Sequence, residues 1–214
     1  MSKKNDLQKE RREFLKASAF VAGGVMMSGY SWAGTNSSVD DTIKIALIGC
    51  GDRGTGAAFQ ALSTKNNIKL VAMADAFQDR LDSSYKLLVE KFGAKIDVPK
   101  DRQFVGFDAY AKAIALADVV LLVTPPGFRP MHFEEAVKQG KHVFMEKPVA
   151  VDSPGIRKVL VAAEIAKQKK LNVVVGLQRR YQTNYRETLK RIEDGAIGDI
   201  VSGQVYWNSG GVWV

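Results

Sequence analysis

Three glycines follow a short apolar run at the spacing G-x-G-x-x-G, in the segment IALIGCGDRGTG. The run Ile43–Ile48 is β-branched and apolar, which predicts a strand buried on both faces of a parallel sheet. Gly49 would turn the chain sharply, Gly51 would leave the backbone open to a ligand, and Gly54 would let the next helix pack closely. Free N–H groups and the positive end of a helix dipole at this point suit a pyrophosphate.

An acidic residue stands where a dinucleotide fingerprint needs one. A second apolar run, residues 68–74, ends at Asp75, which is 21 residues after Gly54. A carboxylate there can accept hydrogen bonds from the adenosine ribose hydroxyls, which favours NAD over NADP. NADP stays open, because neighbouring side chains could accommodate a phosphate. The alternative interpretation of the whole pattern is a glycine turn with a surface aspartate.

A Glu-Lys-Pro sequence supplies a candidate catalytic group. In HVFMEKP, Glu146 and Lys147 directly follow another apolar run, at the carboxyl end of a predicted strand. Ligands bind outside these ends in a doubly wound sheet, so we expect the Lys147 ammonium near the nicotinamide. There it can hydrogen-bond a substrate hydroxyl and stabilise the alkoxide as hydride leaves. Pro148 would fix the turn, with a cis bond as one way to do so. A surface ion pair is the alternative for the Glu-Lys pair.

Strand-like and helix-like segments alternate between residues 42 and 176, with a polar connection over 94–107. Further buried strands are predicted over residues 117–123, 142–148 and 171–175. Helices are predicted over residues 76–93, 108–116 with Asp108 as N-cap, 131–140 and 153–170. This order predicts an α/β fold, a Rossmann doubly wound parallel sheet that forms an NAD(P)-binding domain over residues 42–176.

The pattern changes after Gly176. Residues 181–194 predict an amphipathic helix, and residues 201–206 predict an alternating strand that has no partner left in the sequence. We therefore expect residues 177–214 to begin a second, α+β domain for substrate binding and oligomerisation that is cut short. The chain would then be a fragment of a protein roughly twice as long.

The first 33 residues are typical of an export signal. Paired arginines open the segment RREFLK at residues 11–16, an apolar run of 14 residues covers 17–30, and S-W-A at 31–33 offers a cleavage site. This resembles a twin-arginine signal, with a basic amphipathic helix as the alternative. We expect the twin-arginine export machinery as a partner, residues 34–41 as a linker, and a periplasmic or other extracytoplasmic location. A cofactor would be inserted before export and held tightly.

Composition excludes several classes of function. The net charge is +8, but the basic residues are spread along the chain without a dense block or interleaved aromatic residues, which argues against a nucleic-acid binder. The single cysteine, Cys50, cannot form an intrachain disulfide and is interpreted as a small loop residue. The two histidines, His132 and His142, give no metal-ligand spacing, so no metal site is predicted.

The motifs GCGDRG, Asp75, TPP, H-x-x-x-A from His132, GKHVFMEKP and GLQRRY occur in an order that resembles the Gfo/Idh/MocA oxidoreductase family. The resemblance covers about residues 42–214, the amino-terminal half of such a protein, and GKHV-x-x-EKP is its most specific element. It implies an NAD(P)-dependent enzyme that transfers hydride between a tightly bound nicotinamide cofactor and a sugar or cyclitol carbinol. It also implies a homo-oligomer when the protein is full length.

The resemblance assigns residues as well. It implies Lys147 as the catalytic residue, with Lys147 and Arg180 at the substrate. The family's further catalytic Asp and His would lie beyond residue 214, so this chain alone is expected to be inactive. The expected cofactor contacts are Gly49, Gly51, Asp52, Arg53, Gly54, Asp75, Thr124, Pro125, Pro126, His132, Glu146, Lys147, Gln178 and Arg179.

Several alternatives stay open. One branch of the family is similar in fold but cleaves glycosides through transient oxidation of the sugar by NAD, and its G-x-G-x-R-G loop is matched here through Arg53. The TPP segment lacks the aromatic residues of that branch. A non-catalytic nucleotide- or sugar-binding protein is the third possibility, although Lys147 is present. His132 could instead pack beneath the 124–126 loop, and Arg179 and Arg180 could be solvated charges.

Overall fold

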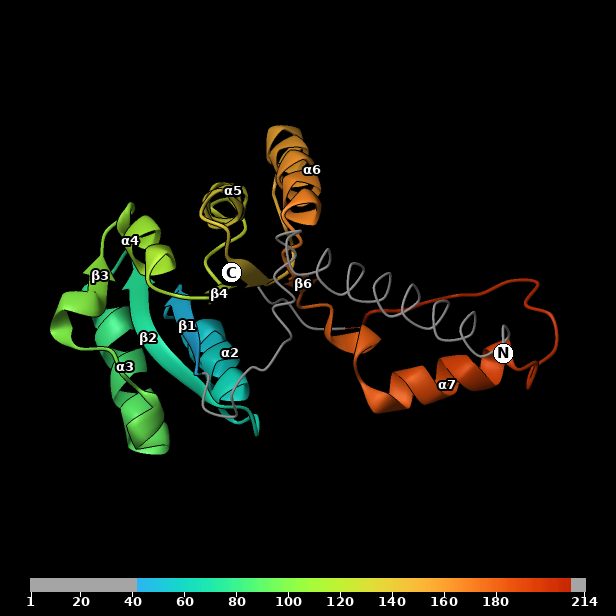
Figure 1. The fold of residues 1–214 in the computed structure, drawn as a ribbon. Coiled ribbons are helices and arrows are strands. Elements are labelled where there is room, and N and C mark those ends of the chain that lie inside the picture. The colour runs from blue at the N-terminus through green and yellow to red at the C-terminus, as the bar shows by residue number, and fades with distance from the viewer. Residues whose placement is uncertain (1–41, 209–214) are drawn as a thin grey trace, which may run out of the picture. The chain divides into compact units, whose positions relative to one another are not determined.

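The computed structural model describes residues 42–208 of the chain. The expected export signal at 1–33, the linker at 34–41 and residues 209–214 lie outside the described residues. The described part contains one six-stranded sheet in which every neighbouring pair of strands is parallel (Figure 1). The strand order is β3-β2-β1-β4-β5-β6, so the chain reverses its direction of winding between β1 and β4. The predicted Rossmann α/β fold is therefore confirmed.

The elements alternate as the sequence predicts. The strands are β1 Ile43–Ile48, β2 Ile68–Asp75, β3 Gln103–Val105, β4 Val119–Leu122, β5 His142–Met145 and β6 Val173–Val175. The helices are α2 Asp52–Leu62, α3 Gln78–Phe92, α4 Ala109–Ala115, α5 Arg129–Lys138, α6 Ser153–Gln168 and α7 Thr183–Glu193. A short 3-10 helix, η3 Gln178–Arg180, connects β6 to α7.

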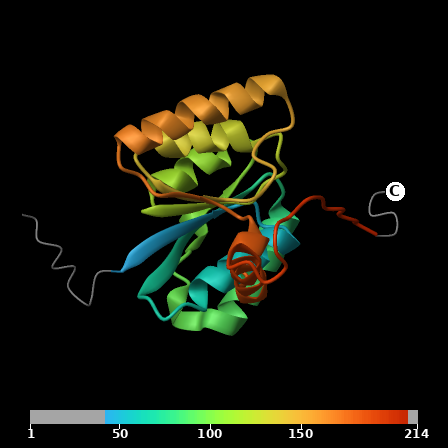
Figure 2. The same ribbon diagram turned by 90° about the vertical axis from the view of Figure 1, so that its right-hand side faces the viewer.

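Two hydrophobic cores hold the layers together. Helices α4, α5 and α6 cover one face of the sheet, and α2 and α3 cover the other (Figure 2). Successive side chains of a strand point to opposite faces. In β1, accordingly, Ala46 and Ile48 join the first core while Ile45 and Leu47 join the second. Burial on both faces explains why this strand is apolar almost throughout.

Two sequence predictions at the sheet need correction. The 94–107 stretch, expected to be a polar connection, contains β3, which pairs with β2 from Met73↔Gln103 onward. The strand is only three residues long, begins with Gln103 and lies in a polar stretch, so it displays no apolar strand pattern. The strand predicted over 201–206 is wrong, because residues 201–208 form no helix or strand. Val201 is 93% and Val205 96% exposed, and no strand of the described chain pairs with them, which a stable strand needs.

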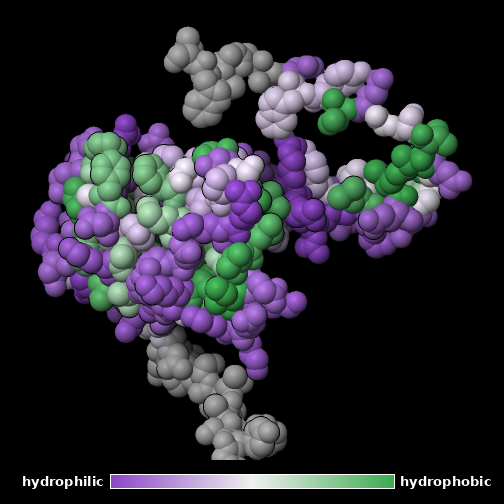
Figure 3. Space-filling model, turned by 90° about the horizontal axis from the view of Figure 1, so that it is seen from above, coloured by the Kyte–Doolittle hydropathy of each residue, from purple (hydrophilic) through white to green (hydrophobic). Residues whose placement is uncertain are grey.

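Figure 3, which looks down on the side of α4, α5 and α6, shows mainly hydrophilic side chains interrupted by apolar patches. Helix α7 is amphipathic as predicted, yet it has no buried residue. Among residues 42–208, none of the helices has both the length and the apolar character that crossing a bilayer requires.

Candidate functional site

A cleft of about 1060 Å³ opens at the carboxyl edge of the sheet, where ligands bind in folds of this class. Its walls come from the loops that follow β1, β2, β3, β4 and β5, which the parallel register brings to one edge. Predicted site residues that line it are Gly49, Gly51, Asp52, Arg53, Asp75, Thr124, Pro125, Pro126, His132, Glu146, Lys147 and Gln178.

The glycine turn has the geometry predicted for it. Gly49 has a φ of +96°, and a Cβ there would stand 2.6 Å from the backbone nitrogen of Thr124. A Cβ at Gly54 would stand 1.8 Å from the Gly49 carbonyl oxygen, so only glycine allows α2 to begin this close to β1. Packing therefore demands glycine at both positions.

Gly51 is different, because no protein atom lies within 4 Å of the place where its Cβ would be. Packing does not require glycine at this position, and the space beside it belongs to the cleft. The N–H groups at the start of any helix have no intrahelical partner, and in α2 no N-cap side chain bonds them either. An uncapped helix start with open space beside its backbone fits a pyrophosphate.

Asp75 holds the glycine turn as well as lining the cleft. Its Oδ2 accepts a hydrogen bond from the Cys50 N–H at 2.6 Å, and its Oδ1 accepts one from the Phe77 N–H at 3.0 Å. A carboxylate has about four acceptor positions, so acceptor capacity is left for the ribose hydroxyls. The Cys50 side chain beside it is buried, and this burial together with the Asp75 charge raises the pKa of the thiol.

An ion pair joins the glycine loop to the end of β5. Arg53, in the first turn of α2, donates to Glu146, and the two side chains are 50% and 10% exposed. Glu146 also packs against Gly176, where a Cβ would lie 2.7 Å from the Glu146 Oε1. Glu146 therefore ties together three segments of the cleft, in addition to any contact it makes with a cofactor.

Lys147 stands in the cleft as an unpaired cation. No hydrogen bond or ion pair to another part of residues 42–208 holds its ammonium group, and the side chain is exposed. The peptide bond between Lys147 and Pro148 is cis, as the sequence suggested. An ammonium without an internal partner is available to a hydroxyl or an oxyanion of a ligand.

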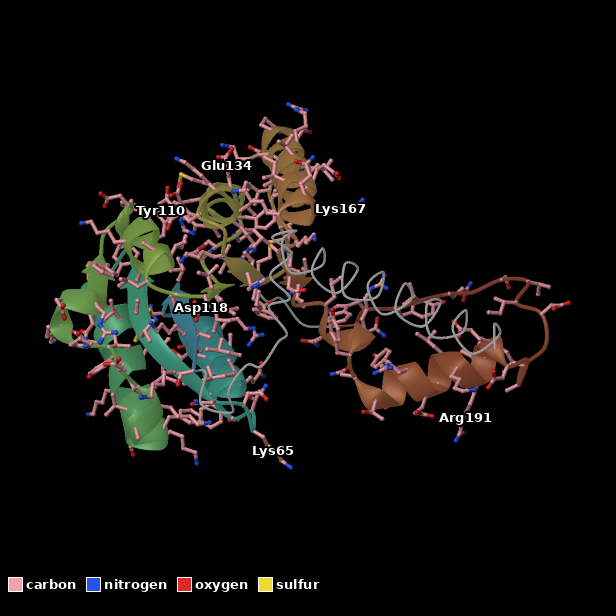
Figure 4. The ribbon with its side chains drawn as sticks, in the orientation of Figure 1. Lys65, Tyr110, Asp118, Glu134, Lys167 and Arg191 are labelled. Carbon is pink, nitrogen blue, oxygen red and sulfur yellow. The ribbon has the colours of Figure 1, made fainter. Side chains whose placement is uncertain are left out.

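His132 packs beneath the loop that follows β4. It is 4% exposed, its Nδ1 lies 3.2 Å from the Thr124 Oγ1, and its ring stacks on Tyr110 with centroids 4.2 Å apart. Figure 4 marks Tyr110 on α4, beside α5. Burial and the nearby Arg129 charge lower the pKa of His132 to about 4, so the ring is neutral at physiological pH. The packing alternative describes its position, and a direct cofactor contact stays a prediction.

Sequence reasoning missed several cleft residues. Arg129 is 2% exposed and donates to the carbonyl oxygens of Thr124 and Pro148. Phe107 and Phe128 stack with ring centroids 6.0 Å apart, and Phe77 lines the cleft near Asp75. A helix that opens with F-R-P gives no sign that its arginine is buried, whereas glycine patterns are visible directly.

Three predicted residues lie away from the cleft lining. Gly54 is buried beneath the turn, and Arg179 and Arg180 are exposed. The Arg179 guanidinium lies over the rings of Tyr185 and Trp207, at 4.9 and 5.2 Å from their centroids. The roles expected for both arginines at the nicotinamide or substrate stay predictions.

Comparison with known proteins agrees with this geometry. A model of the GFO_IDH_MocA oxidoreductase family, described as an NAD-binding Rossmann fold, matches residues 43–177. Inositol 2-dehydrogenase from Burkholderia vietnamiensis is 35% identical over 161 residues, which is 73% of this chain and 43% of that protein. A protein of glycosyl hydrolase family 109 from Streptomyces coelicolor is 25% identical over 176 residues, covering 81% of this chain and 35% of that protein.

Solved structures show the same fold. The structure of scyllo-inositol dehydrogenase from Lactobacillus casei, with bound cofactor NAD(H) and scyllo-inositol, is 27% identical with a TM-score of 0.58. The match covers 74% of this chain and 43% of that one. The chain thus spans less than half the length of the relatives it matches.

The second and third glycines of the motif, Gly51 and Gly54, should respond differently to a single methyl group. We expect Gly54→Ala to lower the free energy of unfolding by about 3 kcal/mol or more, because backbone must move to admit it. Gly51→Ala should cost at most about 1 kcal/mol, as a helix N-cap change, yet weaken NAD(H) binding at least roughly tenfold. Urea unfolding and calorimetric titration measure the two effects, and equal stability losses would contradict this division.

Protonation of His132 should make the fold less stable in acid. Its folded pKa of about 4 lies below the ordinary 6.5, so between these values the unfolded chain binds the extra proton. The free energy of unfolding should fall as pH drops through this window, by up to about 1.4 kcal/mol per pH unit from this group. His132→Gln should flatten the dependence in urea unfolding at matched pH values. Identical slopes in both proteins would refute the assignment.

Proposed function

We propose that this chain, which belongs to the Gfo/Idh/MocA oxidoreductase family, is the cofactor-binding part of an NAD-dependent enzyme that oxidises or reduces a carbinol of a sugar or cyclitol. The observation that carries the proposal is the single cleft that combines the open backbone at Gly51, the carboxylate of Asp75 and the unpaired ammonium of Lys147. The relatives named inositol dehydrogenases support a polyhydroxylated substrate.

Each part of the cleft would have a separate task. The first turn of α2, with Gly51, would receive the pyrophosphate, and Asp75 the adenosine ribose. The nicotinamide, when bound, supplies the hydride acceptor or donor. Lys147 would hydrogen-bond the reacting hydroxyl and stabilise negative charge on its oxygen. Arg180 is proposed to contact the substrate from the start of the second domain.

Asp75 favours NAD, and NADP stays possible. The carboxylate would repel a ribose phosphate, but Arg80 also lines the cleft and its side chain is 60% exposed. An exposed guanidinium binds phosphate well. The balance between the Asp75 and Arg80 charges decides how strongly the site discriminates between NAD and NADP, so both dinucleotides belong in the binding assay.

A glycoside-cleaving activity is the second candidate. It is favoured by the similarity to a family 109 glycosyl hydrolase and by Arg53 in the glycine loop. Arg53 is paired with Glu146, however, and a dehydrogenase can use the same ion pair, so Arg53 does not separate the two activities. Stoichiometry separates the two activities. A dehydrogenase consumes an external oxidant or ketose with each turnover, whereas the glycosidase releases an alcohol without net redox change. A non-catalytic binding protein, the third candidate, would show neither activity.

We further propose a second domain that completes the site. The relatives are more than twice as long as the matched segment, and α7 carries an amphipathic face without buried residues. That domain, beginning near residue 177, would supply an acid/base partner for Lys147 and the contacts of a homo-oligomer. Turnover by the 214-residue chain alone would contradict the need for an acid/base partner from the second domain. A complete protein that is monomeric in light scattering would contradict the homo-oligomer.

Residues 1–33 are proposed to direct export by the twin-arginine route, which carries folded proteins and so allows a cofactor to be loaded beforehand. Support comes from the RREFLK segment, the short apolar run and the S-W-A site. We expect replacement of both arginines by lysine to shift the protein from the periplasmic to the cytoplasmic fraction in cell fractionation. An unchanged distribution would argue for the basic amphipathic helix instead.

The central test is mass spectrometry and absorbance of ligand released by denaturing the purified complete protein. Near-stoichiometric NAD(H) is the expected result. NADP(H) in its place would overturn the argument from Asp75, and a protein that is empty and binds neither dinucleotide would refute the catalytic proposal. Assays with sugars and cyclitols follow, in which Lys147→Met should lower kcat by roughly 100- to 10,000-fold while the protein still binds the dinucleotide.

A further inference from the structure

Arg129 is the largest side chain that is fully buried in the described part of the chain. It opens α5 and is 2% exposed, although burying a charge is costly unless the charge is paired. No carboxylate among residues 42–208 forms an ion pair with it. Burial lowers its pKa, and only the more distant Glu146 charge opposes that shift. Such a residue calls for an explanation beyond packing.

The two ends of its guanidinium are bound to two different loops. Nη2 donates to the carbonyl oxygen of Thr124, in the loop after β4. Nη1 donates to the carbonyl oxygen of Pro148, in the turn after β5. Its Nε–H has no partner in the described structure. The guanidinium thus donates to two carbonyl oxygens, while its Nε–H is left without an acceptor.

The turn that carries Lys147 depends on this contact. Within residues 42–208, the bond from Arg129 is the only hydrogen bond that the structure gives to residues 147–151. Pro148 has no N–H of its own to offer the sheet. Glu146 and Asp152 on either side are held by other bonds, to Leu122 and Gly155. The intervening segment is therefore held by this one hydrogen bond and by the packing of Val149 against the core.

We propose that Arg129 is a positioning residue that ties the loop at 124–126 to the turn at 147–148, and so sets where the Lys147 ammonium stands in the cleft. This inference rests on the function proposed above, because it assigns Arg129 an effect through Lys147. Stability alone does not explain a buried arginine at this position, since apolar residues of similar volume are often as stabilising as buried charges. A planar, two-pronged donor matches two carbonyl groups in a way that lysine cannot.

The first experiment measures the turn directly and needs no turnover. In the 214-residue chain, NMR order parameters of the Val149, Ala150 and Val151 amides should fall from about 0.85 to below about 0.6 in Arg129→Met. Arg102→Met is the matched control, because Arg102 also donates to a backbone carbonyl, that of Val71 at 3.2 Å, but does not line the cleft. Order parameters of residues 149–151 that stay at the wild-type level in Arg129→Met would overturn the proposal.

The second experiment measures the consequence in the complete protein. Arg129→Met should lower kcat roughly 10- to 100-fold through misplacement of Lys147. In a Lys147→Met background the same change should have no further effect on kcat, because residues that act as a unit are not additive. An equal loss in both backgrounds would indicate a general structural role and overturn the proposal. If Arg129→Met does not fold, Arg129→Lys takes its place, since lysine keeps the charge without the two-pronged donor.

Failure of this inference differs from failure of the proposed function. Wild-type kcat in Arg129→Met, alongside an inactive Lys147→Met, would overturn the positioning role alone. Wild-type kcat in Lys147→Met, or absence of dinucleotide binding in the wild-type protein, would overturn the proposed function and the positioning role with it.

Discussion

Backbone contact between the start of α2 and the end of β1 is the constraint on which the site depends. The Gly49 carbonyl oxygen occupies the place where a side chain at residue 54 would begin, so the helix can approach only because that side chain is missing. Gly49 in turn lies against the backbone of Thr124. Two absent side chains thereby fix three segments: the central strand, the helix start with its positive dipole end, and the loop after β4.

Around this point, charged side chains fall into two groups. Asp75, Arg53, Glu146 and Arg129 are each bound to backbone or to another charge, and each makes at least one bond to a segment that is distant in the sequence. They hold the loops of the cleft in register with one another. Lys147 forms no hydrogen bond or ion pair within the described residues, so its ammonium group is free to bind a ligand. Partnered charges thus build the cleft, and the unpartnered ammonium of Lys147 is placed to act in it.

The sequence predicted those features that rest on patterns of residue type. Buried parallel strands must be apolar on both faces, so β1, β2, β4 and β5 are visible in the sequence. The tasks of Gly49 and Gly54 follow from the absence of a side chain and agree with the geometry. The edge strand β6 is equally visible because it is apolar, whereas β3 opens with a glutamine inside a polar stretch and was missed for that reason. Residues 201–206 alternate like a strand, but an alternating pattern does not form a strand without neighbours to pair with.

Tertiary surroundings explain the remaining misses. Arg129 looks in the sequence like any basic residue at a helix start, and only the convergence of two loops reveals its bonds. The sequence left two roles open for His132; its burial beneath Thr124 is visible only in the structure, and a direct cofactor contact stays a prediction. Properties that arise where several loops meet therefore need coordinates, whereas properties of one strand or one turn do not.

The environment of Cys50 has a consequence for the chemical durability of the site. A thiol reacts with oxidants and disulfides as its thiolate, and burial beside Asp75 keeps this thiol protonated and out of contact with solvent. The chain's only sulfhydryl therefore lies inside the glycine turn in its protonated, unreactive form, where oxidants in solution do not reach it.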